Sequence, residues 1–323
     1  MICGICNNSE KNRTLLVREM MFGSERVFTY LECSNCGCLQ IVNPPSDMTN
    51  IYPPNYYSIQ KVSSHVNRPR DLIVTALTKK KDGYALFKRG IVGRLIHATR
   101  EKDGLFDLLG NAQVLPNSRV LDVGCGAGIL LNRLRDYGFT DLTGIDPYAS
   151  EHFGSGMKIL NKTLEDLGDD DKFDMIIFSH SFEHISDQFA TLRKASTLLN
   201  TNGACLIRMP VKTEHIWNRY GTYWVQIDAP RHYMIHTVKS FDLLLRRTDL
   251  VLEDIVFDSS ILQFVGSEQN IRGIPLKSQE SYYEDKERSI FTAKQIRKFK
   301  KRAKQLNRAQ QGDMAGFCLR KKD

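Results

Sequence analysis

The chain has 323 residues, of which 41% are hydrophobic and 25% are charged, as in an ordinary globular protein. This length accommodates one large domain and a small one. We see no signal peptide after Met1 and no apolar run near the roughly 20 residues that span a bilayer, so we expect a cytoplasmic protein with reduced thiols. The net charge of +8 indicates either an anionic partner or a solvated basic surface.

The first 43 residues contain paired cysteines. Two C-x2-C pairs supply four thiols, from Cys3, Cys6, Cys33 and Cys36. Four thiolates complete a tetrahedral zinc site and leave no open position, so the expected zinc is structural. Strands are expected at 14–17 and 27–32, and Cys38 is a spare that could replace Cys36. Because so small a module needs metal to fold, residues 1–43 are predicted to form a zinc ribbon; four free thiols are the alternative.

Residues 44–118 are predicted to be a connector followed by basic helices that cap the next domain. The segment Tyr56-Tyr57-Ser58 either borders a substrate pocket or packs the connector down. Apolar residues between 69 and 108 follow helical spacing, with breaks expected at the glycines. Such helices could pack against a domain or lie on a membrane, and packing is the favoured interpretation.

The most informative segment is Val120–Gly128. An apolar strand runs into Asp122, and glycines then alternate at Gly124, Gly126 and Gly128. This pattern predicts a buried parallel strand, a turn without side chains and a helix from Ile129. The third glycine comes too early for the dinucleotide-binding fingerprint.

Further strands follow at intervals typical of a doubly wound sheet. The strand at 141–146 ends in Asp146, in the position of an acid that binds ribose hydroxyls, and Pro147 is predicted to begin a helix. Other strands are expected at 157–160, 173–178, 204–210, 250–257 and 316–320.

The glycine turn, D-x-G-x-G-x-G, resembles motif I of the class I S-adenosylmethionine (SAM) methyltransferases. Residues 179–184 resemble the segment after strand four in the branch with ubiquinone-biosynthesis and sugar-tailoring enzymes. The resemblance covers roughly 119–211 and implies that residues 119–323 form an α/β, doubly wound, seven-stranded Rossmann-like sheet with an antiparallel last strand. The SAM-binding residues that it implies are Asp122, Gly124, Cys125, Gly126, Gly128, Asp146, Leu164, Glu165, Ser179 and His180.

The acceptor side is predicted from a second pattern. Trp224-x3-Asp228-x-Pro230-x-His232 resembles a segment of polysaccharide-cluster methyltransferases. Asp228 and His232 could form a general base with its orienting partner, and His184 is a second candidate base. Glu183 and His184 could also hold a divalent ion, as in the ubiquinone branch, but the sequence shows no third ligand. Aromatic residues of 217–233 would stack on a sugar.

A basic helix is expected over 292–311. Together these features predict SAM-dependent methyl transfer to a sugar or related polar metabolite, in glycan or secondary-metabolite biosynthesis. The expected partner is a polar, anionic small molecule or nucleotide-linked sugar. The alternatives are an rRNA or tRNA methyltransferase that uses the ribbon to bind RNA, and a non-catalytic binding protein.

Overall fold

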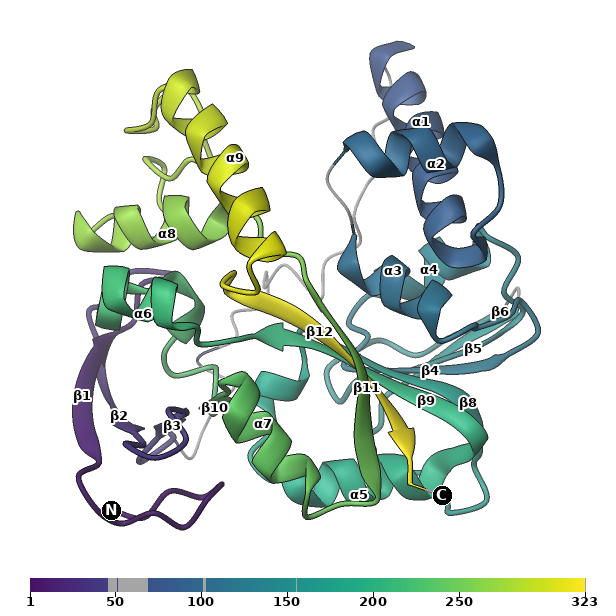
Figure 1. Ribbon diagram of the computed structural model, residues 1–323, viewed down its shortest axis with the longest axis horizontal. Helices are drawn as coiled ribbons and strands as arrows, with labels where there is room; N and C mark the ends of the chain where they lie inside the picture. The colour runs from purple at the N-terminus through teal and green to yellow at the C-terminus, as the bar shows by residue number, and fades with distance from the viewer. Residues whose placement is uncertain (46–50, 52–68, 101–102, 155, 323) are drawn as a thin grey trace.

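A computed structural model describes residues 1–45, 51, 69–100, 103–154 and 156–322. The tyrosines expected near a pocket, Tyr56 and Tyr57, lie outside this range. The described chain contains a small sheet at the amino terminus, a large central sheet and helices on both faces of that sheet (Figure 1). None of the described helices has the length and apolar character needed to cross a bilayer.

The central sheet has eight strands. Their order is β11 (Leu250–Phe257), β12 (Met314–Lys321), β9 (Leu199–Pro210), β8 (Phe173–Ser179), β4 (Arg119–Val123), β5 (Asp141–Ile145), β7 (Met157–Leu160) and β6 (His152–Gly154). Strand β12 is antiparallel to both neighbours, whereas β9, β8, β4, β5 and β7 pair in parallel. The predicted doubly wound sheet with an antiparallel last strand is therefore confirmed, and β6 extends it by one strand.

The segment after Asp146 differs from the prediction. Pro147 begins no helix: the chain turns there, and β6 then pairs antiparallel with β7. Asp146 holds this turn, because its Oδ1 accepts a hydrogen bond from the Tyr148 amide at 2.8 Å. The residues after Pro147 that were expected to form a helix instead form this turn and strand β6. The helix predicted from the proline is therefore wrong.

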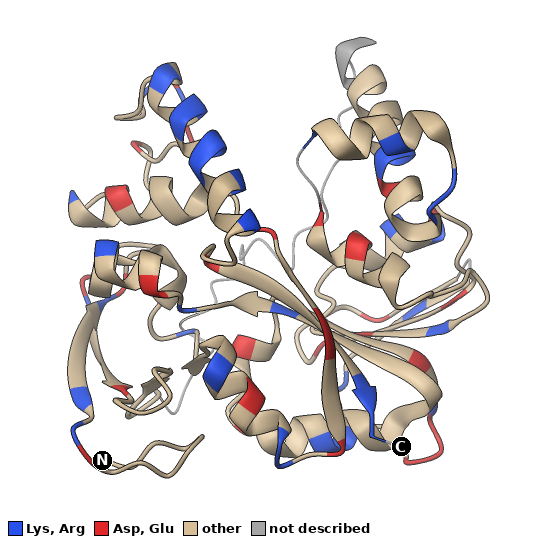
Figure 2. Cartoon of the chain, in the orientation of Figure 1, with Lys and Arg blue, Asp and Glu red and all other residues tan. Residues whose placement is uncertain are grey.

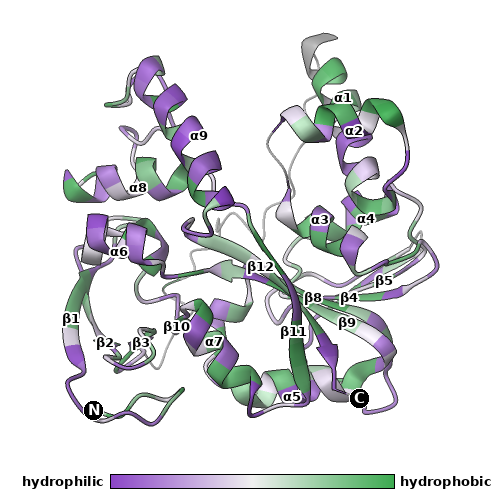
Figure 3. Cartoon of the chain, viewed as in Figure 1, coloured by the Kyte–Doolittle hydropathy of each residue, from purple (hydrophilic) through white to green (hydrophobic). Residues whose placement is uncertain are grey.

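Two layers of helices bury the central sheet. One layer contains α1 (Pro69–Phe87), α2 (Ile91–Thr99), α3 (Gly104–Asn111) and α4 (Ile129–Arg135), and the other contains α5 (Gln188–Leu198) and α7 (Val238–Leu245) (Figure 1). A hydrophobic core lies on each face of the sheet, and alternate residues of β8 point into one or the other. Ile176 packs in the core under α5 and α7, and Ile177 packs in the core under α3 and α4. Because both faces of the sheet are buried, the central strands consist largely of hydrophobic residues, which are green in Figure 3. The expected helix beginning at Ile129 and the helices at 69–108 are confirmed. Of the breaks expected at glycines, the one at Gly90 is found, whereas Gly83 and Gly93 lie within α1 and α2.

The small sheet is shared between distant parts of the chain. Strands β1 (Arg13–Arg18), β2 (Val27–Glu32) and β3 (Leu39–Ile41) come from the amino terminus, and β10 (Met234–Ile235) completes the sheet by pairing with β3. Tyr30 and Leu39 share a core with Trp224 and with residues of α6 (Glu214–Tyr220) and α8 (Leu262–Ile271). The amino-terminal module therefore packs as part of the larger body.

Candidate functional site

A cavity of about 1670 Å³ opens at the carboxyl ends of the central strands. Its lining includes the turns after β4 and β5, the segment after β8, the loop that precedes β10, the residues that follow β11, and helix α9 (Ala293–Arg308). In doubly wound sheets, ligands bind at this edge. Almost all of the residues predicted to bind SAM line this cavity, and Gly128 is the exception.

The three glycines of the turn have two different roles. Gly124 and Gly126 line the cavity with positive φ angles of 75° and 50°, and a Cβ on Gly124 would lie 2.5 Å from the Cβ of Ser181. Gly128, with φ 73°, precedes α4, where a Cβ would lie 2.6 Å from the Cδ1 of Ile159. Gly124 therefore lets the turn lie against Ser181, Gly126 supplies a backbone with positive φ at the cavity wall, and Gly128 lets α4 pack against β7.

The acids at the ends of β4 and β5 lie on either side of the turn. Asp146 accepts a hydrogen bond from the Gly126 amide at 3.0 Å, which ties β5 to the glycine turn. Asp122 is 3% exposed, and burial together with the nearby Asp146 carboxylate raises the pKa of Asp122 to about 7. A cationic ligand would favour the ionised form of Asp122.

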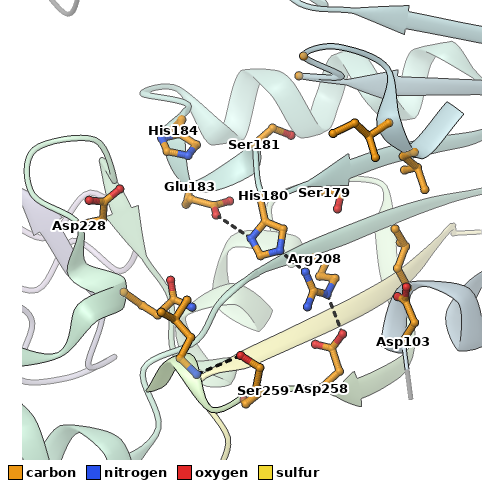
Figure 4. Close-up of a pocket in the computed structure, with 18 of the residues that line it drawn as sticks. Asp103, Ser179, His180, Ser181, Glu183, His184, Arg208, Asp228, Asp258 and Ser259 are labelled. Atoms are coloured by element: carbon orange, nitrogen blue, oxygen red, sulfur yellow. Dashed lines mark hydrogen bonds and ion pairs between the residues drawn. The ribbon is translucent and has the colours of Figure 1, made fainter. Parts of the chain in front are cut away.

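A polar chain crosses the cavity floor, as Figure 4 shows. The Asp258 carboxylate accepts a hydrogen bond from Arg208 Nε at 2.8 Å, Arg208 donates to His180, and His180 Nδ1 lies 3.8 Å from Glu183 Oε1. Arg208 and Asp258 were not predicted as site residues, because Arg208 lies within a predicted strand and Asp258 just beyond another. Their position near the carboxyl ends of predicted strands was the one sequence feature that could have identified them.

Glu183, His184 and His232 form a second cluster. One ligand atom from each lies within 4.8 Å of the others, and Glu183 Oε1 is 4.0 Å from His232 Nε2. His184 Nδ1 donates to the Arg231 carbonyl at 3.0 Å and His232 Nδ1 to the Gln226 carbonyl at 2.8 Å, so each Nε2 carries the lone pair.

Burial and its neighbours set the charge of this cluster. Burial alone would raise the pKa of Glu183, but the nearby His180 ring and the adjacent imidazoles of His184 and His232 lower it to about 2. Burial lowers the pKa of His184 to about 4. Near neutral pH the cluster therefore combines an ionised carboxylate with a neutral His184 imidazole.

Asp228 lies beside His232 but interacts mainly with another residue. Its carboxylate accepts hydrogen bonds from Arg231 at 2.6 to 3.0 Å, whereas its Oδ2 is 3.9 Å from His232 Nε2. Although burial opposes it, Arg231 lowers the pKa of Asp228. The backbone carbonyl of Gln226 thus orients the His232 ring, and Asp228 contributes negative charge near it.

The expectation that aromatic residues of 217–233 stack on a sugar is wrong for Trp224, since Trp224 is 1% exposed and its Nε1 donates to Asp313 Oδ2 at 2.9 Å. Tyr233 is an aromatic residue of this loop that does line the cavity.

The amino-terminal sheet holds the His232 loop. The Tyr30 hydroxyl donates to the His232 carbonyl at 2.8 Å, and the buried Arg231 joins Asp228 to Glu19, with 2.8 Å between Arg231 Nη2 and Glu19 Oε1. Sequence reasoning missed this connection, because more than 200 residues separate Glu19 from Arg231.

The paired cysteines converge as predicted. The sulfurs of Cys3, Cys6, Cys33 and Cys36 all lie within 4.8 Å of one another. The Cys3 to Cys36 and Cys6 to Cys33 distances are 3.7 and 3.5 Å, and the Cys38 sulfur is 3.6 Å from that of Cys3. Four thiols in this arrangement fit a tetrahedral zinc ion.

Comparison with known proteins agrees with this architecture. A protein family described as "Methyltransferase domain" matches residues 70–255, which is more than half of the chain. The chain therefore belongs to this methyltransferase family, and its strand order is that of the class I enzymes.

Among curated relatives, the ubiquinone biosynthesis O-methyltransferase of Rickettsia conorii (strain Malish 7) is 27% identical over 167 residues, covering 47% of this chain and 56% of the relative. The enzyme of the same name from Azorhizobium caulinodans is 32% identical over 103 residues, covering 29% and 40%. The chain thus spans about half the length of the curated relatives that it matches.

Similar solved structures include a putative sarcosine dimethylglycine methyltransferase from Galdieria sulphuraria, with a TM-score of 0.44, 17% identity and coverage of 67% and 83% of the two chains. A cyclopropane synthase from Mycobacterium tuberculosis has a TM-score of 0.44, 16% identity and coverage of 75% and 97%.

Proposed function

We propose that this protein transfers the methyl group of SAM to a hydroxyl of a sugar or related polar metabolite, in glycan or secondary-metabolite biosynthesis. One observation carries the proposal: the glycine turn with its two acids opens into the same cavity as the cluster of Glu183, His184 and His232. The names of the ubiquinone-biosynthesis relatives support an oxygen acceptor.

The cofactor half of the site would hold SAM by complementary charge and close approach. Asp122 would face the amino-acid portion, Gly124 and Gly126 would let the ligand approach the backbone, and Asp146 would accept hydrogen bonds from the ribose hydroxyls. Leu164 is buried and Glu165 exposed at the cavity wall, where both would flank the adenine. Ser179 and His180 lie at the end of β8 and would face the methyl group.

Methyl transfer is an in-line displacement, so correct positioning supplies most of the rate enhancement. The acceptor oxygen bonds to the methyl carbon as the carbon–sulfur bond breaks, which leaves S-adenosylhomocysteine. The acceptor proton passes to Nε2 of His232, whose Nδ1 donates to the Gln226 carbonyl. The carboxylates of Glu183 and Asp228, at 4.0 and 3.9 Å from that nitrogen, stabilise the imidazolium.

The same cluster fits a divalent cation, with His232 as the third ligand that the sequence did not reveal. Glu183 Oε2 is buried and has no hydrogen-bond partner among the described residues, and both histidines are oriented through Nδ1 by backbone carbonyls. A bound cation would polarise the acceptor hydroxyl and lower its pKa. Elemental analysis of wild type and Glu183→Gln, before and after dialysis against a chelator, distinguishes this arrangement from a metal-free base.

The four thiols of Cys3, Cys6, Cys33 and Cys36 would hold a structural zinc ion, which would stabilise the amino-terminal sheet. Since that sheet contacts the His232 loop, the zinc ion would affect catalysis indirectly, by keeping His232 in position.

Calorimetric titration with SAM, followed by a screen for transfer of labelled methyl to nucleotide sugars and to RNA, tests the proposed function. SAM binding with methylation of a sugar-linked acceptor is the expected result. RNA methylation would favour the alternative activity, which the basic charge of helix α9 supports. A chain that binds no SAM would refute both.

A further inference from the structure

Helix α9 concentrates positive charge on one wall of the cavity. Eight of its 16 residues are lysine or arginine, and none is acidic. Figure 2 shows these cations along the helix, and in Figure 3 most of the helix has the colour of hydrophilic residues. Three of them line the cavity: Lys300, Lys304 and Arg308. Because they are spaced at intervals of four residues, they form one row on the same face of the helix.

The helix is held firmly in this orientation. Its apolar side buries Ile296, Ala303 and Leu306, and Phe299 stacks on Phe264 of α8 with 5.1 Å between ring centroids. Asn307 forms two hydrogen bonds of 3.0 Å with the backbone of Ser259, just beyond β11. The row of cations is therefore fixed to the edge of the central sheet.

The cavity-facing cations of α9 differ from other arginines around them. Arg133 is paired with Asp82 and Asp103, and Arg208 with Asp258. Within the part of the chain that the structure describes, no hydrogen bond or ion pair neutralises Lys300, Lys304 or Arg308. Three like charges along one face repel one another, so the row favours an anionic ligand.

We infer that Lys300, Lys304 and Arg308 form a subsite for the phosphate or diphosphate group of the acceptor. This inference rests on the proposed function, because it places the acceptor beside SAM in one cavity. Ammonium and guanidinium groups are good phosphate donors. A volume of about 1670 Å³ exceeds the roughly 300 to 1,000 Å³ of ordinary ligand pockets, which leaves space for a second ligand.

A phosphorylated small molecule fits this row better than a nucleic acid does. The subsite cations face the cavity, whereas Lys294, Lys298 and Lys301 do not line it. A polymer bound along the outside of α9 would use the outer cations, while an acceptor inside the cavity would use the inner row. The two rows therefore provide matched variants of equal charge.

The test titrates the full-length protein with inorganic pyrophosphate by calorimetry. The inner variant K300Q/K304Q/R308Q should bind pyrophosphate at least about tenfold more weakly than wild type, since three charge-assisted contacts are lost. The outer variant K294Q/K298Q/K301Q should change the affinity by less than about twofold, because exposed charges away from the ligand contribute little. Both variants should keep the wild-type SAM affinity and circular dichroism spectrum.

Three results would overturn the inference: no pyrophosphate binding by wild type, an equal loss in both variants, or a single-stranded RNA of about 20 nucleotides that binds better than pyrophosphate and weakens equally in both. The two proposals fail separately. Loss of the phosphate subsite leaves SAM binding intact, and absence of SAM binding refutes the methyltransferase function without affecting the pyrophosphate titration.

Discussion

The two halves of the cavity are built in different ways. On the cofactor side, Asp122, the glycine turn and Asp146 lie within 25 residues of one another and are joined by adjacent parallel strands. On the acceptor side, His232 lies in an irregular loop that Tyr30 and Glu19 hold from about 200 residues away. Local backbone geometry positions the first half, whereas long-range side-chain contacts position the second.

This difference predicts different responses to mutation. A change in the glycine turn should act directly on the ligand, because the backbone itself forms the site. A change around His232 should alter turnover while SAM still binds, and some of these changes should act from the amino-terminal sheet.

The largest effect is expected at the turn itself. Gly126→Arg should abolish measurable SAM binding by calorimetry, because a long side chain at φ 50° would fill the cavity. Gly168→Arg is the control, since Gly168 does not line the cavity and its Cβ would meet only the Asp171 carboxylate, at 3.6 Å. Unchanged SAM affinity in Gly126→Arg would exclude this turn as the cofactor site.

His232→Ala should lower turnover by about 10²- to 10⁴-fold, the usual contribution of a general base, with SAM affinity within about threefold of wild type. Single-turnover transfer of labelled methyl measures the first quantity and calorimetry the second. His215→Ala is the matched variant, because His215 lies on α6 and does not line the cavity. A fully active His232→Ala enzyme would remove this residue from the mechanism.

The cysteine cluster tests whether the amino-terminal sheet supports the acceptor side. Cys33→Ser should reduce zinc to well below one ion per chain and lower turnover more than SAM affinity, since the sheet holds the His232 loop. Cys38→Ser should keep its zinc, because the other four thiols remain within 4.8 Å of one another. Full zinc occupancy in Cys33→Ser, measured by elemental analysis, would contradict the ligand set.

The cofactor side should respond to pH through Asp122. Its pKa of about 7 lies above that of a free carboxyl group, so below pH 7 SAM must displace a proton from it. SAM affinity should therefore fall about tenfold between pH 8 and pH 6. Asp122→Asn should bind SAM more weakly and without this pH dependence. An affinity independent of pH in the wild-type protein would show that the Asp122 charge is not used.

The smallest expected effect is that of one hydrogen bond between the two regions. Tyr30→Phe removes the donor to the His232 carbonyl and should lower the free energy of unfolding by about 1 kcal/mol. Turnover should fall a few-fold while SAM affinity stays constant. Tyr223→Phe, at a side chain that is 53% exposed, should leave both the free energy of unfolding and the turnover unchanged. Equal effects of the two variants on turnover would argue against positioning by Tyr30.

The sequence predicted most of what local patterns encode. The strands of the central sheet, the helix from Ile129 and the basic helix at 292–311 were found in the structure, because apolar periodicity and glycine placement act over short distances. The helix expected at Pro147 was wrong, since pairing with β7 outweighed the preference of proline for a first helical position.

The acceptor side was predicted less completely. His184 and His232 were identified as candidates, but their approach to Glu183 depends on loops that no short motif encodes. The roles of Arg231 and Trp224 were not visible in the sequence. Both are buried polar side chains whose partners, Glu19 and Asp313, are far away in the chain.

Strand β10 has a consequence for how parts of this architecture can be exchanged. Only two residues, Met234 and Ile235, complete a sheet whose other strands come from the first 41 residues of the chain. Exchange of the amino-terminal module alone should therefore disturb the loop that carries His232, because it replaces the strand with which β10 pairs. Chimeric enzymes made from related proteins should accordingly retain both segments from the same parent.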